Sequence, residues 1–122
     1  CYDIRFPTHF IDLASGGAKI MVVCASWAPG PEKLHQWRTL VTARAMDSVS
    51  FVVAVDQAPL GDIETPAAPT GIGHSMVVDP TGRVLLELGT EPELAFVDVD
   101  PGRVAAAREA LPLLTGNPTR SL

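Results

Sequence analysis

The chain has 122 residues, 47% hydrophobic and 19% charged, which is the size and balance of one globular domain with a single core. Its net charge is −5 and its basic residues are scattered, which argues against nucleic acid or an anionic membrane surface as a partner. No apolar run reaches the ~18–20 residues of a membrane helix, and two cysteines without metal-ligand spacing are typical of a reduced, cytoplasmic setting.

Helix and strand patterns alternate in the first half of the chain. Pro7 suits the first turn of a helix, and Gly16 and Gly17 are typical of its end. Continuous apolar runs rich in β-branched residues predict strands that are buried on both faces. A stripe of apolar residues at helical spacing predicts a second helix. The expected elements are a helix over 6–15, a strand over 18–26, a helix over 32–48 and a strand over 51–55.

The second half predicts a long loop, a meander of strands and a last helix. Residues 56–73 contain several prolines and glycines, and such a long irregular stretch is usually functional or flexible. A turn over 80–83 separates two short apolar runs, which therefore predict a hairpin. Asp100 and Pro101 suit the start of the last helix. The expected elements are strands over 75–79, 84–88 and 93–100, a helix over 103–111 and a loose tail over 115–122.

The order of these elements predicts the α/β (α+β) class, with helices layered on a sheet. We expect one domain over 1–114, followed by the tail. His9, His35 and His74 share no metal-ligand spacing with the cysteines or the carboxylates. Neither a metal nor a cofactor is therefore expected.

Cys1 could be a nucleophile or a structural residue. A thiol needs an activating neighbour before much of it is thiolate at neutral pH. A helix that begins near Phe6 would direct its positive end towards the sulfur, which favours the thiolate. From the residues alone, both roles remain open.

The stretch Cys1-Tyr2-Asp3-Ile4-Arg5-Phe6-Pro7 resembles the nucleophile segment of the carbon–nitrogen hydrolase (nitrilase) superfamily. The likeness continues in register through Val23-Cys24-Ala25-Ser26-Trp27, His35-Gln36-Trp37 and the hairpin over 73–82, and it covers residues 1 to about 114. The branch that it resembles most is that of the deaminated glutathione amidases and ω-amidases. The fold implied by this resemblance is the C-terminal part of a four-layer αββα sandwich.

The resemblance also implies a mechanism and a set of site residues. In the family a cysteine attacks the carbon of a small linear amide, a glutamate acts as general base and acid, and a lysine stabilises the oxyanion together with the backbone N–H after the cysteine. A thioester forms, ammonia leaves, and water releases the acid. The implied nucleophile is Cys1, and the implied oxyanion donor is the N–H of Tyr2. Ser26 and Trp27 could line the substrate pocket or belong to the core.

The family's glutamate and lysine precede the cysteine, and Lys19, Glu32 and Lys33 do not match their positions. We therefore expect this chain to be the C-terminal part of a longer protein, and to lack turnover on its own. The chain also departs from the family at two scaffold positions: Thr8 stands where the family has Glu, and Asp47-Ser48 stand where it has Glu-Asn. The resemblance further implies a homodimer through the helices near 6–15 and 32–48.

Other readings of the sequence remain open. The protein could hydrolyse a nitrile or a carbamoyl group rather than an amide. It could be an N-terminal nucleophile hydrolase that uses the α-amine of Cys1 as its base. It could also be a catalytically silent binding or assembly module with the same fold. Asp3 and Arg5 are more simply explained as a scaffold salt bridge than as substrate contacts.

Overall fold

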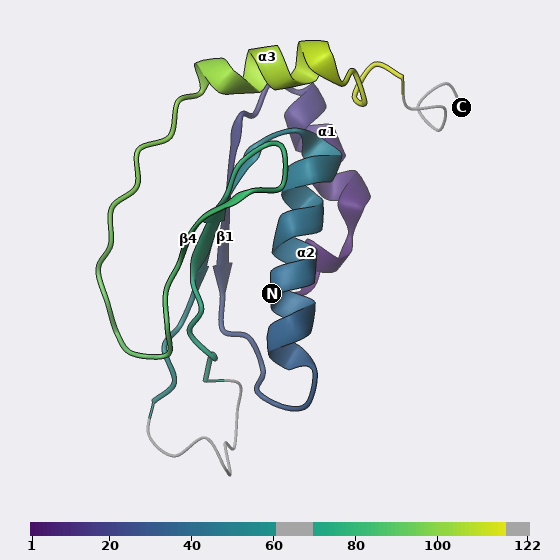
Figure 1. Ribbon diagram of the computed structural model, residues 1–122. Helices are drawn as coiled ribbons and strands as arrows, with labels where there is room; N and C mark the ends of the chain where they lie inside the picture. Colours follow the sequence, from purple (N-terminus) through teal and green to yellow (C-terminus); the bar gives the residue numbers. More distant parts are fainter. Residues whose placement is uncertain (61–69, 117–122) are drawn as a thin grey trace.

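The structure is a computed structural model that describes residues 1–60 and 70–116 (Figure 1). The expected mixed α/β class is confirmed, with helices packed on one four-stranded sheet. Within the described part of the chain, no helix is both long enough and apolar enough to cross a membrane. In chain order the elements are η1 Tyr2–Arg5, α1 Pro7–Ser15, β1 Ile20–Ala25, α2 Lys33–Ser48, β2 Phe51–Asp56, β3 Met76–Val78, β4 Val84–Glu87 and α3 Gly102–Ala110.

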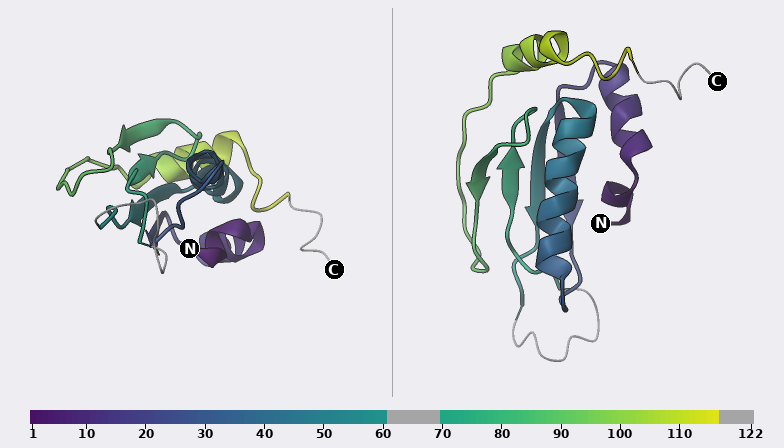
Figure 2. Two further views of the ribbon diagram at one scale, coloured as in Figure 1. Left: turned by 90° about the horizontal axis from the view of Figure 1, so that it is seen from below. Right: turned by 45° about the vertical axis from the view of Figure 1, so that its right-hand side comes forward.

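The sheet has the strand order β1-β2-β3-β4, with a parallel pair followed by two antiparallel pairs. The helix α2 connects the parallel strands β1 and β2, as a crossover must. The hairpin predicted between β3 and β4 is confirmed. Figures 1 and 2 show α1 and α2 side by side on one face of the sheet, with α3 across one end. Because β1 and β2 are parallel, their C-terminal ends lie side by side, near the start of α2.

The core lies between the sheet and the helices α1 and α2. The helix α2 contributes Trp37, Val41 and Ala45, all fully buried, as its apolar spacing predicts. Burying side chains of this size stabilises a core by about 1.5–3 kcal/mol each. The ring of Trp37 lies 5.3 Å from that of Trp27, between centroids, so the core extends to the end of β1.

The prediction that β1 is buried on both faces is wrong. Its burial alternates, and Val22 is 67% exposed while Met21 and Val23 are buried. Met21 and Val23 face the helices, whereas no described segment covers the side chain of Val22. The continuous apolar run arises because both faces of β1 carry apolar side chains. Only the face towards the helices is covered by the described residues.

The predicted strand over 93–100 is also wrong, because this segment is extended but forms no strand. A strand needs a partner with which to exchange backbone hydrogen bonds, and the segment has none among the described residues. Leu94 and Phe96 are 80% and 87% exposed. The alternation of apolar and polar residues in this segment therefore did not indicate a paired strand.

The chain ends differ slightly from the sequence-based expectations. The 3-10 turn η1 was not predicted, and α3 begins at Gly102 rather than at Arg103. Asp100 still contributes to that start, because the Gly102 N–H donates to its carboxylate at 2.9 Å. The domain limits 1–114 and the loose tail over 115–122 stay predictions. Residues 117–122 of that tail, and residues 61–69 of the predicted loop, lie outside the described residues.

Arg108 of α3 connects three separate segments through its guanidinium group. We expect Arg108→Met to lower the free energy of unfolding by about 2–3 kcal/mol, because partly buried acceptors would lose a charged donor. Urea unfolding checks this value, and Arg103→Met, an exposed change on the same helix, should cost less than about 0.5 kcal/mol. Equal effects of the two changes would contradict the prediction. The acceptors of Arg108 are the carbonyls of Ala14, Ala18 and Val49 and the hydroxyl of Ser50.

Candidate active site

Cys1 lies beside the end of β1. It immediately precedes η1, and its exposed side chain faces the loop that follows Ala25. The backbone N–H of Ser26 donates to the Cys1 sulfur at 3.0 Å. A hydrogen bond donated to sulfur favours the thiolate over the thiol. The carboxyl ends of parallel strands are also where open α/β sheets form their sites, so Cys1 is placed where a nucleophile could meet a ligand.

An open hollow of about 240 Å³ adjoins the sulfur. Trp27 lines this hollow although it is only 3% exposed, and its indole N–H donates to the Lys33 carbonyl at 2.9 Å. The structure therefore places Trp27 both in the core and on the wall of the hollow. Sequence reasoning had treated these two positions as alternatives. The residues that line the hollow are Cys1, Tyr2, Arg5, Ser26, Trp27, Ala28 and Lys33.

Asp56, at the end of β2, is a site residue that the sequence analysis missed. It is 5% exposed, and its two carboxylate oxygens accept the N–H groups of Trp27 and Ile72, each at 2.7 Å. Burial raises the pKa of Asp56 above its ordinary value of 3.8, although these backbone hydrogen bonds oppose the rise. Asp56 thus connects the loop that follows β1 with the segment that precedes β3. The signal that could have indicated it is a carboxylate at the end of a buried strand.

The segment that precedes β3 is held close to β2. Gly71 has a φ of +84°, and a Cβ at this position would overlap the carbonyl oxygen of Gln57. Only glycine fits both the backbone conformation and the close approach. The Ser75 hydroxyl adds a further connection, since it accepts the Asp56 N–H at 3.0 Å and donates to the Asp56 carbonyl.

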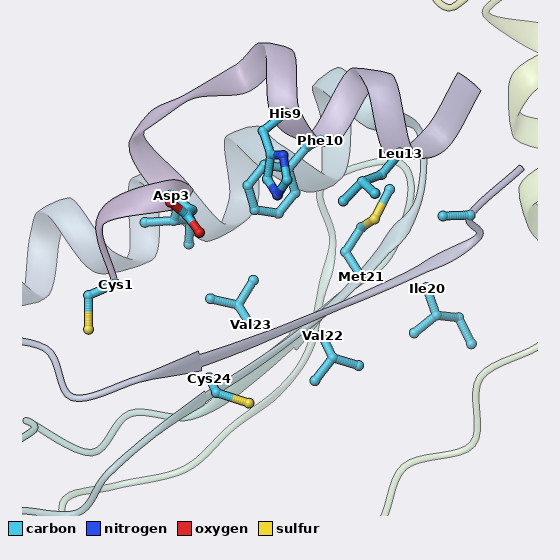
Figure 3. A pocket seen from close by; sticks show the side chains of 12 residues that line it. Cys1, Asp3, His9, Phe10, Leu13, Ile20, Met21, Val22, Val23 and Cys24 are labelled. Atoms are coloured by element: carbon cyan, nitrogen blue, oxygen red, sulfur yellow. The ribbon is translucent and has the colours of Figure 1, made fainter. Parts of the chain in front are cut away.

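A second hollow, of about 320 Å³, lies along the edge of β1 that has no partner strand among the described residues (Figure 3). Cys1 borders both hollows, with Asp3 and His9 among its neighbours in the second. Figure 3 shows Met21 and Val23 pointing from β1 towards α1, while Cys24 points to the other side of the strand. The two cysteines are both free thiols, and only Cys1 borders the hollow beside Trp27.

The expected salt bridge between Asp3 and Arg5 does not form among the described residues. The Arg5 guanidinium instead lies 4.9 Å from the centroid of the Trp27 ring and donates to the Gln36 side-chain oxygen at 3.1 Å. A cation over an indole face is attracted by the electron-rich ring. Arg5 therefore lines the hollow beside Cys1 rather than balancing Asp3.

The described residues bring together a thiol, a hydrogen-bond donor to its sulfur and a hollow for a small molecule. They form no group of three or more potential metal ligands, and none of the glutamates they include borders either hollow at Cys1. The first amides of a helix have no partner within the helix, and the N–H of Tyr2 is such an amide. This arrangement can hold a nucleophile and an oxyanion next to each other.

Comparison with known proteins extends this description. The sequence profile of a family described as carbon–nitrogen hydrolase matches residues 1–109. The chain is 50% identical over 119 residues to the hydrolase Rv0480c of Mycobacterium tuberculosis, covering 93% of this chain and 42% of that protein. It is 37% identical over 114 residues to the deaminated glutathione amidase of Escherichia coli O157:H7, covering 93% of this chain and 40% of the amidase. The chain thus spans about two-fifths of the length of these relatives.

Solved structures give the same picture. The Nit3 protein of Saccharomyces cerevisiae, a member of the nitrilase superfamily, superposes with a TM-score of 0.78 at 32% identity, over 93% of this chain and 40% of Nit3. A variant of the amidase from Nesterenkonia sp. AN1 superposes with a TM-score of 0.71 at 27% identity, over 98% of this chain and 40% of the amidase. In that amidase the acetamide moiety of fluoroacetamide is covalently attached to the active-site cysteine.

Proposed function

Because this chain belongs to the carbon–nitrogen hydrolase family, we propose that it carries the cysteine nucleophile of an amidase that hydrolyses a small linear amide. The observation that supports this role most directly is the position of Cys1, whose sulfur accepts the Ser26 N–H beside an open hollow. The covalent adduct on the cysteine of the related amidase from Nesterenkonia is consistent with the same use of Cys1.

In the proposed reaction the Cys1 thiolate attacks the amide carbon. A carbon–sulfur bond forms, the carbon–nitrogen bond breaks, and the leaving nitrogen takes a proton and departs as ammonia. The N–H of Tyr2 stabilises the oxyanion, while Ser26 and Trp27 form the wall of the substrate pocket. Water then hydrolyses the thioester and releases the acid. The proposed base and second oxyanion donor are the family's glutamate and lysine, supplied from outside residues 1–122.

The class of substrate follows from the relatives. Proteins named deaminated glutathione amidase and 2-oxoglutaramate amidase are among the matches, at 37% and 36% identity. Small linear amides are therefore proposed ahead of nitriles and carbamoyl compounds. A silent assembly module is the second candidate, because none of the described glutamates borders either hollow at Cys1.

The direct test is ammonia release from small ω-amides by the protein that contains this chain. We expect turnover with amides and less with matched nitriles or carbamoyl compounds. We expect none from the isolated polypeptide of residues 1–122, which supplies the nucleophile without matches to the family's glutamate and lysine. Turnover by this polypeptide that Cys1→Ala abolishes would contradict the proposed need for further residues. Absence of turnover by the whole protein on all three classes would favour the silent module.

We also propose a cytoplasmic homodimer that pairs through α1 and α2. These helices cover the same face of the sheet, and large apolar side chains stay exposed on or beside them, including Phe6, Leu13 and Met46. Apolar surface of this kind is more common at interfaces than on isolated domains. Sedimentation velocity should show a dimer, which Met46→Glu weakens. A monomer at micromolar concentration would contradict the proposal.

A further inference from the structure

The turn η1, which immediately follows Cys1, lacks one hydrogen bond of its own. In a 3-10 helix each carbonyl can accept the N–H three residues further on. The carbonyl of Asp3 does so, because the Phe6 N–H donates to it at 3.0 Å. For the carbonyl of Ile4 the corresponding residue is Pro7, which has no N–H. The sequence therefore leaves the Ile4 carbonyl in need of a donor from another part of the chain.

Arg44 of α2 supplies that donor. Its Nη1 donates to the Ile4 carbonyl at 2.8 Å, and this hydrogen bond is buried. The side chain of Arg44 is 8% exposed, and Ile4 belongs to the core. A buried carbonyl without a donor is costly, and a charged donor makes a stronger hydrogen bond than a neutral one. The guanidinium group thus attaches the backbone of η1 firmly to α2.

The guanidinium group of Arg44 is itself held in place. Its Nε and Nη2 donate to the same carboxylate oxygen of Asp47, at 3.2 and 2.9 Å. The hydroxyl of Ser48 donates to the backbone carbonyl of Arg44 at 2.7 Å. Asp47 therefore balances the buried charge and orients the guanidinium before any substrate arrives. A side chain that its neighbours lock in this way can fix the position of another group precisely.

The position of η1 matters because two groups of the candidate site lie at its start. Cys1 precedes the turn, and Tyr2 is its first residue. On the side of β1 the sulfur is held by the Ser26 N–H. The Arg5 side chain also connects η1 to α2, but this contact is exposed, whereas that of Arg44 is buried. Misplacing reacting groups by about 1 Å can lower a rate about 10²-fold.

From this geometry we propose that Arg44 is a positioning residue for the proposed amidase reaction. Its hydrogen bond to the Ile4 carbonyl fixes η1. The Cys1 sulfur therefore stays beside the Ser26 N–H, and the Tyr2 N–H stays next to the sulfur. Arg44 lines neither hollow at Cys1, so it acts on the nucleophile and not on substrate binding. Its effect on turnover rests on the proposed function, whereas its effect on the reactivity of the thiol does not.

Arg44→Met tests this role, because it removes the donors and keeps an apolar side chain. In the protein that contains this chain, we expect kcat for a small linear amide to fall about 30- to 100-fold while KM changes less than about twofold. Iodoacetamide gives a readout without turnover, since it alkylates a thiolate by forming a carbon–sulfur bond and releasing iodide. Its rate at Cys1, read from the mass of the peptide, should fall about 3- to 10-fold as the sulfur leaves the N–H that favours the thiolate.

The matched control is Arg108→Met. Arg108 is another partly buried arginine that donates to backbone carbonyls, but it does so near the opposite end of β1 from Cys1. This variant should lose stability in urea and still keep kcat and the alkylation rate close to those of the wild type. Equal losses of kcat in the two variants would overturn the positioning role. A loss of stability in Arg44→Met with unchanged kcat and alkylation rate would also overturn it.

Arg44→Lys is the conservative variant. Its ammonium group can donate to the Ile4 carbonyl, but it lacks the planar fork that also engages Asp47. We expect partial rescue, with kcat about 3- to 10-fold below that of the wild type and KM unchanged. If Arg44→Met does not fold, this variant decides, and wild-type kcat and alkylation rate in it would overturn the proposal. If the wild type hydrolyses no amide, the proposed function fails, and the alkylation rates alone decide the role of Arg44.

Discussion

Replacing Cys1 by alanine is expected to lower amidase turnover of the protein that contains this chain by at least about 10⁴-fold, because the change removes the sulfur that attacks the amide and forms the thioester. Binding should survive, since the walls of the hollow, including Trp27 and Lys33, are unchanged. The measurement is kcat for ammonia release, together with the Kd of an unreactive substrate analogue.

The control for this change is Cys24→Ser. Cys24 is also a free, exposed thiol, but its side chain points to the other side of β1. It should therefore keep turnover close to that of the wild type. If turnover were lost in Cys24→Ser and retained in Cys1→Ala, the nucleophile would be Cys24 and the assignment to Cys1 would be wrong.

Replacing Asp56 by alanine is expected to impair both stability and reactivity. The change leaves the buried N–H of Trp27 and the partly buried N–H of Ile72 without an acceptor, which costs about 2–4 kcal/mol of unfolding free energy. It also removes the anchor of the Trp27 amide, and the amide just before it, that of Ser26, donates to the Cys1 sulfur. The rate at which iodoacetamide alkylates Cys1 should therefore fall at temperatures where the variant is still folded. A loss of stability with an unchanged alkylation rate would show that Asp56 has no influence on Cys1.

The pH dependence of stability gives an independent check on Asp56. Burial raises the pKa of its carboxyl group above 3.8 in the folded protein, so the folded state binds the proton more tightly than the unfolded state. This contribution to stability is complete below pH 3.8 and is lost as the pH rises through the folded pKa. The wild type should accordingly lose stability relative to Asp56→Asn over that interval. A relative gain with rising pH would contradict the raised pKa.

Local patterns predicted those elements whose hydrogen bonds are completed by nearby parts of the chain. The strands β1 and β2 and the helix α2 form one parallel unit, and their apolar runs and helical stripe were sufficient to locate them. The segment over 93–100 and the exposed face of Val22 were predicted incorrectly. Both depend on what packs against them, and a local sequence pattern carries no information about that partner.

The candidate site was only partly predictable for a similar reason. A resemblance to a family identified Cys1, and the end of β1 indicated Ser26 and Trp27 as its neighbours. The positions of Asp56, Arg5 and Lys33 around Trp27 depend on tertiary contacts between separate elements. Asp56 looked like the first residue of a loop, because a carboxylate after an apolar run is equally common in turns.

Cys1 is expected to become covalently attached to the substrate during turnover. The measurement is peptide mass spectrometry of the protein that contains this chain, acid-quenched during turnover of a small linear amide. We expect the acyl group of the substrate on the peptide that contains Cys1, attached as a thioester that hydroxylamine removes, and no adduct on the peptide that contains Cys24. Steady turnover with no acyl group on Cys1, or with the acyl group on another residue, would contradict the account.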